Sequence, residues 1–473
     1  MIAAPGPGGP IAMIQPERVQ PLNDRAPRGA GGFVLYWMQA SQRAEGNHAL
    51  EYAVRQANEL HRPVVAAFGL TDDYPEANER HYAFLLAGLV ETRAALAGRG
   101  IQLVVRRGSP ETVALDLARR ASLVVTDRGY LRHQRAWRQR VGSRAPCRAV
   151  QVESDVVVPV QAASDKEEYA ARTIRSKIRR QLGRFLVPLR ATPVCRDSLG
   201  LRLGSIDLRD PEAVLASLKI DRTVGAVRHY RGGTSHARKL LRRFVSTKLK
   251  DYAELRNDPA RNLQSHVSPY LHFGQISPVE IALAVRRSRA GRDNKDAYLE
   301  ELIVRRELAV NFVSYNARYD SYAGLPAWAR ATLNARRGDR RETVYTLRQL
   351  AASQTHDAYW NAAMAEMRLT GKMHGYMRMY WGKKIIEWTR TPQAAFRTML
   401  ALNNRYFLDG RDPVSYANVA WCFGKHDRPW ARRPVFGTVR YMNAAGLRRK
   451  FHIEEYVERI GRLAVPGAAA QET

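Results

Sequence analysis

Short apolar runs alternate with amphipathic stretches over the first third of the chain. The apolar runs lie at 33–37, 63–68, 101–105, 122–126 and 149–152, and the amphipathic stretches lie near 42–60, 77–98, 110–120 and 131–141. Runs that are apolar at nearly every position, separated by segments of helical length, are typical of a parallel sheet covered on both faces. The pattern predicts an α/β domain over residues 31–160.

Two of the predicted strands end in acidic residues, Asp127 and Glu153. Open α/β sheets usually bind their ligands at this end of the strands. No GxGxxG follows the first strand and no GxxxxGK[ST] occurs in the chain. A plain dinucleotide site and a P-loop ATPase are therefore both disfavoured.

The pattern changes on either side of a basic connector. Residues 161–240 are predicted to be an interdomain linker with a basic helical face, formed by Lys177, Arg179, Arg180, Arg184 and Arg190. A solvated charged face and a binding surface both fit this composition. Residues 1–30 are predicted to be a disordered leader, and residues 464–473 a tail.

The rest of the chain, residues 241–463, has the pattern of an all-α domain. Apolar residues recur at helical spacing through 278–286, 297–312, 357–367, 373–388 and 393–402. The predicted fold class is therefore an α/β N-terminal domain followed by an all-α C-terminal domain.

Composition changes this picture through charge. The chain has 473 residues, and its 76 Lys+Arg against 45 Asp+Glu leave 76 − 45 = +31. Such an excess favours a polyanionic partner, with nucleic acid first and an anionic membrane surface second. No run of 18 apolar residues occurs, so no spanning helix is predicted.

The three cysteines, Cys147, Cys195 and Cys422, are far apart in the sequence. Their spacing disfavours a disulfide scaffold and a CxxC zinc site, and we predict no metal site. The expected compartment is the reducing cytoplasm.

Three tryptophans in the helical half have a suggestive spacing. Trp381 and Trp388 lie two turns apart on one helix stripe, and Trp360 lies on the preceding predicted helix. Core packing explains such a set, and an electron-transfer chain through stacked indoles explains it too. Spacing leaves both interpretations open.

The segment around Ser268 has the signature of a helix start. Ser268 is predicted as the N-cap with Pro269 at the first helical position. Together with the Ser265 hydroxyl, the free N–H groups there could hold a phosphate, or simply cap a structural helix. His272 and His374 are predicted to be structural histidines.

Two further groups combine charge with apolar surroundings. Arg378 lies among apolar residues and needs an acidic partner, for which Asp409 and Asp412 are candidates. Trp421 is followed at 424–433 by a stretch that mixes cations with another indole. That mixture suits an unstacked base lying on an aromatic ring while arginines hold phosphates.

Taken together, the motifs resemble those of class II cyclobutane pyrimidine dimer (CPD) photolyases, a branch of the cryptochrome/photolyase family. The motifs are YWM at 36–38, QRAE at 42–45, YAARTIR at 169–175, LRNDP at 255–259, SPYLHFGQIS at 268–277, GKMHGYMRMYWGKK at 371–384 and LDGRDP at 408–413. The resemblance extends from Phe33 to Phe451 in order. It implies a Rossmann-like antenna domain and a C-terminal catalytic domain that binds FAD.

The resemblance also implies the cofactor site. The residues that match the family's FAD contacts are Tyr252, Gln264, Ser265, His266, Val267, Ser268, Arg378, Asn403 and Asp409. Arg378 and Asp409 match the ion pair beside the isoalloxazine, and Asn403 matches the asparagine that faces flavin N5. In the N-terminal antenna domain no residue set identifies a chromophore, and whether the antenna pocket is filled stays open.

The implied catalytic residues include the three tryptophans. Trp388, Trp360 and Trp381 match, in that order from flavin to surface, the triad that photoreduces FAD, and Tyr345 and Tyr380 are candidate extensions. Glu301 matches the carboxylate that hydrogen-bonds the lesion.

The implied substrate contacts complete the set. The matching residues are Arg256, Asn257, Glu301, Met379 and Trp421. Arg305 departs from the pattern, since some class II members have a second tryptophan there, so the grip on DNA is expected to differ locally.

The implied function is light-driven repair of CPDs in double-stranded DNA by a monomeric enzyme, through electron transfer from excited, reduced FAD to the flipped-out dimer. In a bacterium the enzyme would associate with the nucleoid. A cryptochrome-like light sensor would need no lesion pocket, and a non-enzymatic DNA-binding protein would explain only the charge. A (6-4) photoproduct repair enzyme is disfavoured because the motifs of that family differ from these.

Overall fold

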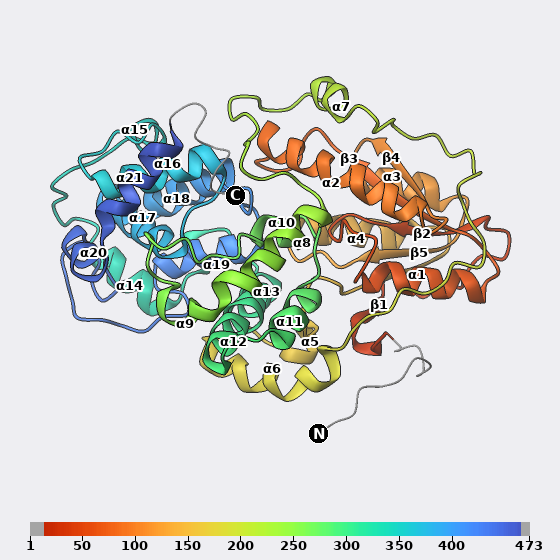
Figure 1. The fold of residues 1–473 in the computed structure, drawn as a ribbon, viewed down its shortest axis with the longest axis horizontal. Coiled ribbons are helices and arrows are strands. Elements are labelled where there is room, and N and C mark those ends of the chain that lie inside the picture. Colours follow the sequence, from red (N-terminus) through yellow and green to blue (C-terminus); the bar gives the residue numbers. More distant parts are fainter. Residues whose placement is uncertain (1–13, 465–473) are drawn as a thin grey trace.

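The computed structural model describes residues 14–464 and shows an α/β half beside a helical half (Figure 1). The α/β half holds one six-stranded sheet with the order β1-β6-β5-β2-β3-β4. All neighbouring strands run parallel except β1, which pairs antiparallel with β6. The strands are β1 (Val19–Pro21), β2 (Phe33–Trp37), β3 (Val64–Leu70), β4 (Gln102–Arg107), β5 (Ala121–Asp127) and β6 (Arg148–Val152).

Helices cover both faces of this sheet. Leu35 and Trp37 of β2 pack with one set of helices, in a cluster that includes α3 and α4 residues. Val34 and Tyr36 point to the other face, in the cluster that includes α1 and α2 residues. Burial on both faces explains the continuous apolar runs, and the prediction of a parallel α/β domain is confirmed. The elements are η1 (Pro16–Arg18), α1 (His48–Glu59), α2 (Glu79–Ala97), α3 (Pro110–Ala118), α4 (Arg132–Arg144) and α5 (Val160–Ala163).

The prediction of a disordered leader is wrong for residues 14–30. Val19–Pro21 form the edge strand β1. The buried guanidinium of Arg18 donates to the backbone carbonyls of Glu153, Val156 and Val157. A three-residue edge strand containing proline has too short a pattern to be seen in the sequence. Residues 1–13, and the tail from 465 onward, lie outside the described residues.

The segment predicted as a linker, 161–240, is built into both halves. Its helix α6 (Ala171–Phe185) buries Ile174 and Ile178, and Arg175 pairs with Glu300 of the helical half at 2.7 Å. The following stretch runs along the α/β half, where Ser198 N–H donates to the Gly100 carbonyl. The apolar stripe that packs α6 against the protein is hard to see in the sequence, because basic residues occupy the rest of the helix.

Two more helices begin in the segment predicted as a linker, α7 (Pro211–Ser217) and α8 (Thr234–Arg243). Of these, α7 contacts α2 and lies over the α/β half in Figure 1. The elements that follow form the helical half, as predicted. They are η2 (Phe244–Lys248), η3 (Leu249–Asp251), α9 (Tyr252–Leu255), α10 (Ser268–His272), α11 (Pro278–Arg287), α12 (Arg292–Leu299), η4 (Glu300–Arg305), α13 (Arg306–Tyr315), η5 (Tyr322–Gly324), α14 (Ala327–Ala335), α15 (Leu347–Ala351), α16 (Ala358–Thr370), α17 (Gly375–Glu387), α18 (Pro392–Tyr406), α19 (Pro413–Cys422), α20 (Ala444–Lys450) and α21 (Ile453–Leu463). In residues 14–464 no helix has the length and apolar character to cross a membrane.

The helix predicted over 297–312 is interrupted by a π-helical turn, η4. Such a turn inserts a residue into the helical register and is frequent at functional sites. Here it carries both Glu301 and Arg305.

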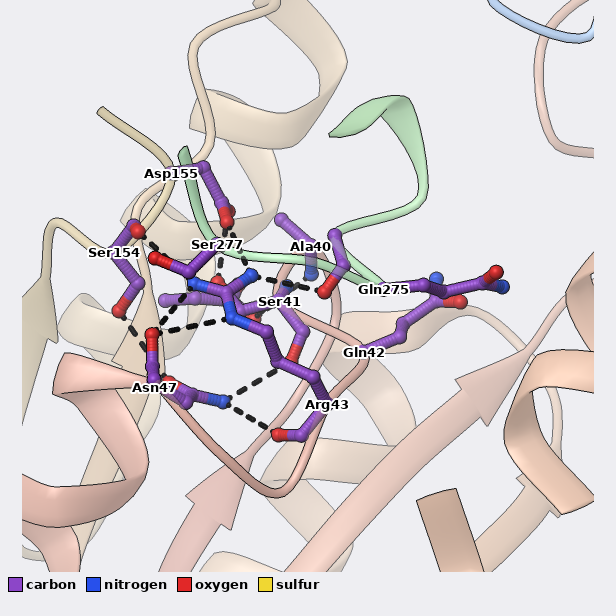
Figure 2. A network of polar contacts seen from close by, with 12 residues as sticks. Ala40, Ser41, Gln42, Arg43, Asn47, Ser154, Asp155, Gln275 and Ser277 are labelled. Carbon is purple, nitrogen blue, oxygen red and sulfur yellow. Dashed lines mark hydrogen bonds and ion pairs between the residues drawn. The ribbon is translucent and has the colours of Figure 1, made fainter. Parts of the chain in front are cut away.

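A buried polar network joins the two halves (Figure 2). Arg43 donates to Asp155 at 2.7 Å and to the Gly274 carbonyl, just after α10, at 2.9 Å. Gly274 has φ +64°, and a Cβ there would lie 1.9 Å from the Ala40 carbonyl oxygen. The glycine therefore permits the close approach that holds the end of α10 against the α/β half.

Candidate functional site

A chain of polar contacts starts at α10 and crosses to the loop after α18. Lys372 donates to the Ser268 hydroxyl at 2.5 Å and lies 3.8 Å from a carboxylate oxygen of Asp409. Arg378 pairs with the other oxygen of Asp409 at 3.0 Å. Of the two candidate partners of Arg378, the structure therefore selects Asp409. Asp412 lies instead 3.4 Å from His272 and caps α19.

This set of contacts combines two cationic side chains with one carboxylate, so its net charge is positive. Burial would raise the pKa of Asp409, but the charges of Arg378 and Lys372 outweigh it and hold that pKa below its usual range. Asp409 is therefore an anion shared by two cations. The guanidinium of Arg378 also lies 3.8 Å above the ring centroid of Phe407. A buried site with one excess positive charge favours an electron-rich ligand.

The predicted capping role of Ser268 is wrong. Val267 occupies the N-cap position, with helical φ and ψ and no side-chain cap, and Ser268 is the first helical residue. The hydroxyl of Ser268 is consequently available to Lys372. Val267 itself is buried, and its side chain is part of the core.

Asn403 is fully buried near the end of α18. Its amide donates to Asn404 and to the Ser415 hydroxyl at 2.9 and 3.0 Å. Ser415 in turn donates to the backbone carbonyl of Asp409 at 2.9 Å. The structure thus brings Asn403 together with the Arg378–Asp409 pair.

Three of the predicted cofactor residues line a cavity of about 600 Å³, namely Gln264, Ser265 and His266. His266 has φ +57° and its ring bonds to Tyr230 and Asn262. Burial lowers its pKa well below the usual value, so the ring is neutral.

The same cavity is lined by cations that the sequence did not single out: Arg243, Lys248 and Arg459. Burial, followed by the charges of Arg243 and Arg459, lowers the pKa of Lys248 to about 8. The Nε atom of Arg459 is buried without a hydrogen-bond partner in the described structure. Glu366 is the only acidic residue among the lining residues described. A donor set with this excess positive charge fits the pyrophosphate of a dinucleotide such as FAD.

The sequence gives little indication that these three cations lie at one site. They come from η2, the end of α8 and the C-terminal helix α21, so no local motif contains them. The amphipathic pattern of α21 predicts a helix but gives no reason to place Arg459 at a ligand.

The predicted lesion contacts lie beside this segment. Arg256 pairs with Glu301 at 2.8 Å, and its guanidinium lies 5.8 Å from the ring centroid of Tyr252. Gln264 donates to the backbone carbonyl of Arg256 at 3.1 Å and also contacts His374. Gln264 therefore connects the predicted substrate contacts with the predicted cofactor segment.

The other predicted DNA contacts are spread along a surface. Trp421 is half-buried between Lys383 and Arg440, which lie 5.1 and 5.4 Å from its ring centroid. Trp430 is 42% exposed, with Arg440 at 4.2 Å from its ring. Lys383 and Arg440 lie outside the predicted stretch 424–433, within which Arg428 lies 5.7 Å from the ring centroid of Trp430. Three further residues show intermediate to full exposure without a shared cluster: Asn257, Arg305 and Met379.

The three tryptophans form one continuous chain in the core of the helical half. The rings of Trp360 and Trp381 are stacked, with centroids 6.5 Å apart and an angle of 12° between the planes. Trp360 and Trp388 meet edge to face at 5.6 Å. Trp360 thus lies between the other two. The Trp381 end meets Phe407, which lies beneath Arg378, and the Trp388 end meets the exposed ring of His356, so these contacts run against the predicted order from flavin to surface. These contacts show core packing, and they are compatible with electron transfer through the same rings, which stays a prediction.

A second cavity, of about 990 Å³, lies where the two halves meet. Its lining combines aromatic rings with cations, including Phe68, Tyr74, Tyr82, Trp137, Arg138 and Arg411. His272 and Asp412 also line it, a few residues after the predicted cofactor residues Ser268 and Asp409. The cavity therefore borders segments that are predicted to hold the cofactor.

The acidic strand ends beneath this cavity are structural. Asp127 accepts the backbone N–H groups of Gln39, Ala40 and Ser41 and pairs with Arg138 at 2.6 Å. Glu153 accepts hydrogen bonds from Arg128 and Tyr130. Their carboxylates hold the lining in place, so their role in binding is indirect. Among the residues described, no group of His, Cys, Asp and Glu is arranged to hold a metal ion.

Comparison with known proteins gives the family. The sequence profile of the family described as DNA photolyase matches residues 34–194. The deoxyribodipyrimidine photo-lyase of Methanothermobacter thermautotrophicus is 53% identical over 454 residues, covering 95% of this chain and 99% of that protein. The chain belongs to the DNA photolyase family. The deoxyribodipyrimidine photo-lyase of Arabidopsis thaliana is 38% identical over 96% of this chain and 93% of that protein.

Solved photolyase structures share the fold. A class III photolyase from Agrobacterium tumefaciens has a TM-score of 0.71 at 19% identity, covering 91% of this chain and 86% of that chain. A photolyase from Sulfolobus tokodaii, described with two FAD molecules, has a TM-score of 0.68 at 16% identity, covering 92% and 95%. The predictions of a photolyase fold and of a photolyase enzyme are confirmed.

Proposed function

We propose that this photolyase is a class II enzyme that repairs CPDs in double-stranded DNA with light, using reduced FAD. The class II assignment rests on the motifs quoted above, from YAARTIR to LDGRDP. The observation that carries the activity is the position of Gln264. It lines the cationic cavity and at the same time holds the backbone of Arg256, whose side chain pairs with Glu301. A protein that only sensed light would not need lesion contacts beside its cofactor.

The residues that would hold FAD fall into two groups, one suited to its pyrophosphate and one to its flavin ring. Arg243, Lys248 and Arg459 suit the pyrophosphate, with Ser265 and His266 on the same cavity wall. Arg378, Lys372 and Asp409 suit the electron-rich end of the flavin, with Asn403 close by. When bound, reduced FAD would be the light-excited one-electron donor to the dimer, with no net change in its own oxidation state after the cyclobutane bonds split.

The chain's own contribution is to bind DNA and to position the lesion. A net charge of +31 favours docking on duplex phosphates with a salt-sensitive affinity. Photolyases are among the enzymes that flip their target out of the duplex, and a dimer is less costly to flip because it is poorly stacked and paired. In our proposal Glu301 turns from Arg256 to hydrogen-bond the dimer, and the freed Arg256 contacts a phosphate.

The cavity at the junction of the two halves is proposed as the antenna site. Its aromatic lining suits a planar chromophore, and Arg138 and Arg411 suit negative charge on it. Its walls include His272 and Asp412, so a chromophore bound there would lie near the segments proposed to hold the flavin. The Sulfolobus tokodaii photolyase is described as implying a novel light-harvesting cofactor.

A cryptochrome-like light sensor is the second candidate, because a Synechocystis cryptochrome shares the fold with a TM-score of 0.71 at 17% identity. The deciding experiment is repair of a single thymine dimer in an oligonucleotide by the reduced, FAD-loaded protein, in light and in darkness. We expect repair in light only. A flavin-loaded protein without repair would favour the sensor, and a protein that binds no flavin would refute both. We expect the enzyme to be a monomer in the cytoplasm, at the DNA.

A further inference from the structure

The basic face predicted for the segment 161–240 is neutralised unevenly in the structure. Lys177 and Arg184 each pair with a carboxylate of their own, at 2.5 and 2.6 Å. Arg179 instead shares the carboxylate of Glu300 with two other arginines. On this face, an excess of cations over carboxylates is therefore found around Glu300.

Three guanidinium groups surround Glu300. Arg175 occupies both carboxylate oxygens, with its Nε atom 3.1 and 3.0 Å from the two and its Nη2 atom 2.7 Å from one of them. Arg305 and Arg179 lie farther away, at 3.6 and 3.9 Å. Within residues 14–464, neither of these two guanidinium groups makes a hydrogen bond to the protein. The cluster thus has two positive charges in excess and two guanidinium groups whose N–H donors are available.

The two available guanidinium groups are open to solvent and come from different elements. The side chain of Arg305, on η4, is 47% exposed, and that of Arg179, on α6, is 62% exposed. The packing of α6 against η4 brings them to the same carboxylate. Exposed ion pairs of this length contribute little to stability, so stability does not explain why three arginines meet here.

The cluster adjoins a predicted lesion contact. Glu300 and Arg305 are the first and last residues of the π-helical turn η4, which also carries Glu301. Glu301 pairs with Arg256 at 2.8 Å, so that neighbouring pair adds no net charge. A ligand held by the cluster would therefore lie beside the residues that are proposed to contact the dimer.

The cluster also lies near the loop that follows α19. The backbone carbonyl of Tyr169, two residues before α6, lies 2.8 Å from Nδ1 of His426, and the Tyr169 hydroxyl donates to the Asp427 carbonyl at 3.3 Å. Asp427 pairs with Arg440, the arginine that contacts the two indoles described above. Burial lowers the pKa of His426 to about 3, and the charge of Arg305 contributes to this shift. Arg305 is therefore close to the loop that carries the other predicted DNA contacts.

We propose that Arg305 and Arg179 together bind one phosphate of the damaged DNA duplex, beside the lesion. The inference rests on the proposed function and adds a place where the backbone of that substrate binds. Both guanidinium groups lie within 4 Å of the same carboxylate, so one phosphate can reach both. Arg175 saturates Glu300 and keeps that carboxylate from competing for their donors. The planar fork of a guanidinium matches the oxygens of a phosphate.

The test is the salt dependence of DNA binding by the full-length, FAD-loaded protein in darkness. The probes are two labelled duplexes of one sequence, one with a single thymine dimer and one without, and binding is followed by fluorescence anisotropy at several salt concentrations. A phosphate contact contributes about 0.9 to the slope of log affinity against log salt concentration, whatever the base sequence. We expect the double variant Arg179→Ala/Arg305→Ala to lose about that much slope and to bind both duplexes more weakly by the same factor.

Arg119→Ala is the matched control. Arg119 is 80% exposed and lies 3.7 Å from a carboxylate oxygen of Asp116, so it is also an arginine in a long surface ion pair, but in the α/β half. We expect this variant to keep the slope and both affinities of the parent protein. Urea unfolding of both variants verifies that each is folded.

Three results would overturn the inference. An unchanged slope and affinity in the double variant would show that the cluster is only a solvated surface. Weaker binding of the dimer-containing duplex alone, with an unchanged slope, would mean that the arginines contact the lesion and not a phosphate. An equal loss in Arg119→Ala would show that any surface charge has this effect. The proposed function fails separately, since a parent protein that binds DNA as expected but repairs no dimer in light would leave the phosphate site intact.

Discussion

The carboxylate of Glu301 lies 2.8 Å from the guanidinium of Arg256, and the two side chains are 40% and 29% exposed. An ion pair this open contributes about 0–1 kcal/mol to stability. The small stabilising effect of this ion pair does not explain the π-helical turn that carries Glu301. Presentation of the Glu301 carboxylate at the surface explains the turn better.

Glu301→Ala should consequently separate stability from repair. We expect the free energy of unfolding to change by less than about 1 kcal/mol, while the number of dimers repaired per absorbed photon falls more than DNA affinity does. The measurement is repair yield per photon beside a DNA titration. Glu254→Ala, at an exposed position on α9, is the control. A defect confined to affinity would refute the assigned role.

Arg459→Ala tests whether the C-terminal helix α21 takes part in cofactor binding. Hydrogen bonds to charged groups contribute about 1.5–3 kcal/mol, so loss of one phosphate contact should weaken FAD binding about tenfold or more. Arg462→Ala removes an exposed arginine from the same helix and should leave binding unchanged. FAD affinity of the apoprotein, measured by quenching of flavin fluorescence, decides the point. Equal affinities in the two variants would place the phosphates elsewhere.

Lys248 gives the cavity a pH dependence with a defined sign. Its pKa in the described structure is lowered to about 8, mainly by burial, so the side chain loses its charge as the pH rises through 8. A phosphate beside it favours the charged form, so binding FAD takes up a proton above that pH. FAD affinity should therefore fall as the pH rises from 8 to 9.5, by at most about tenfold per pH unit. Lys248→Met should bind more weakly at pH 7 and show a flatter profile. The same slope in both proteins would contradict this role.

The same linkage predicts the effect on the apoprotein. Because the folded-state pKa of Lys248 is below its unfolded value, the unfolded chain binds more protons between pH 8 and the unfolded pKa. The contribution of Lys248 to stability therefore rises with pH over that window.

The strands of the α/β half could be predicted closely because burial on both faces makes them apolar at almost every position. Phe33–Trp37 is the strand the pattern predicts. The edge strand β1 was missed because three residues around Pro21 carry no period, and its anchor is the long-range contact of Arg18 with the loop after β6. A π-helical turn is equally invisible, since one inserted residue only blurs a helical period.

Only those site residues that lie in local sequence motifs could be predicted. Arg378 and Asp409 stand in conspicuous local sequences, and the structure pairs them. Lys248 and Arg459 come from distant elements, and only the packing of α21 against α16 brings them to one cavity. Cations assembled by tertiary structure leave no local signature in a chain that is basic throughout.

Trp388→Phe should block photoreduction of oxidised FAD. The edge-to-face contact of Trp388 with Trp360 at 5.6 Å is the link that connects it to the stacked pair. A phenylalanine keeps most of the packing but is much harder to oxidise than an indole. Absorbance of oxidised FAD under blue light with a thiol reductant measures the effect, and Trp328→Phe, at a half-buried position on α14, is the control. Equal photoreduction in the Trp388 variant and the parent would remove Trp388 from the chain.

Arg43→Ala tests the junction that holds α10 against the α/β half. The Arg43 side chain is 0% exposed, and its partner Asp155 is 11% exposed. Removing one member of a buried pair leaves the other charge without compensation, at a cost of about 3–5 kcal/mol. The largest buried apolar cluster spans both halves, so the loss should affect the unfolding of the chain as a whole.

Arg107→Ala is the control for Arg43→Ala. It breaks an exposed pair with Asp72 at 3.1 Å and should cost less than about 1 kcal/mol. Urea unfolding of the two variants gives the comparison. If both variants lose the same small amount, the two halves are held together by apolar packing alone. If Arg43→Ala alone is strongly destabilised, the polar network also fixes how the junction cavity meets the end of α10.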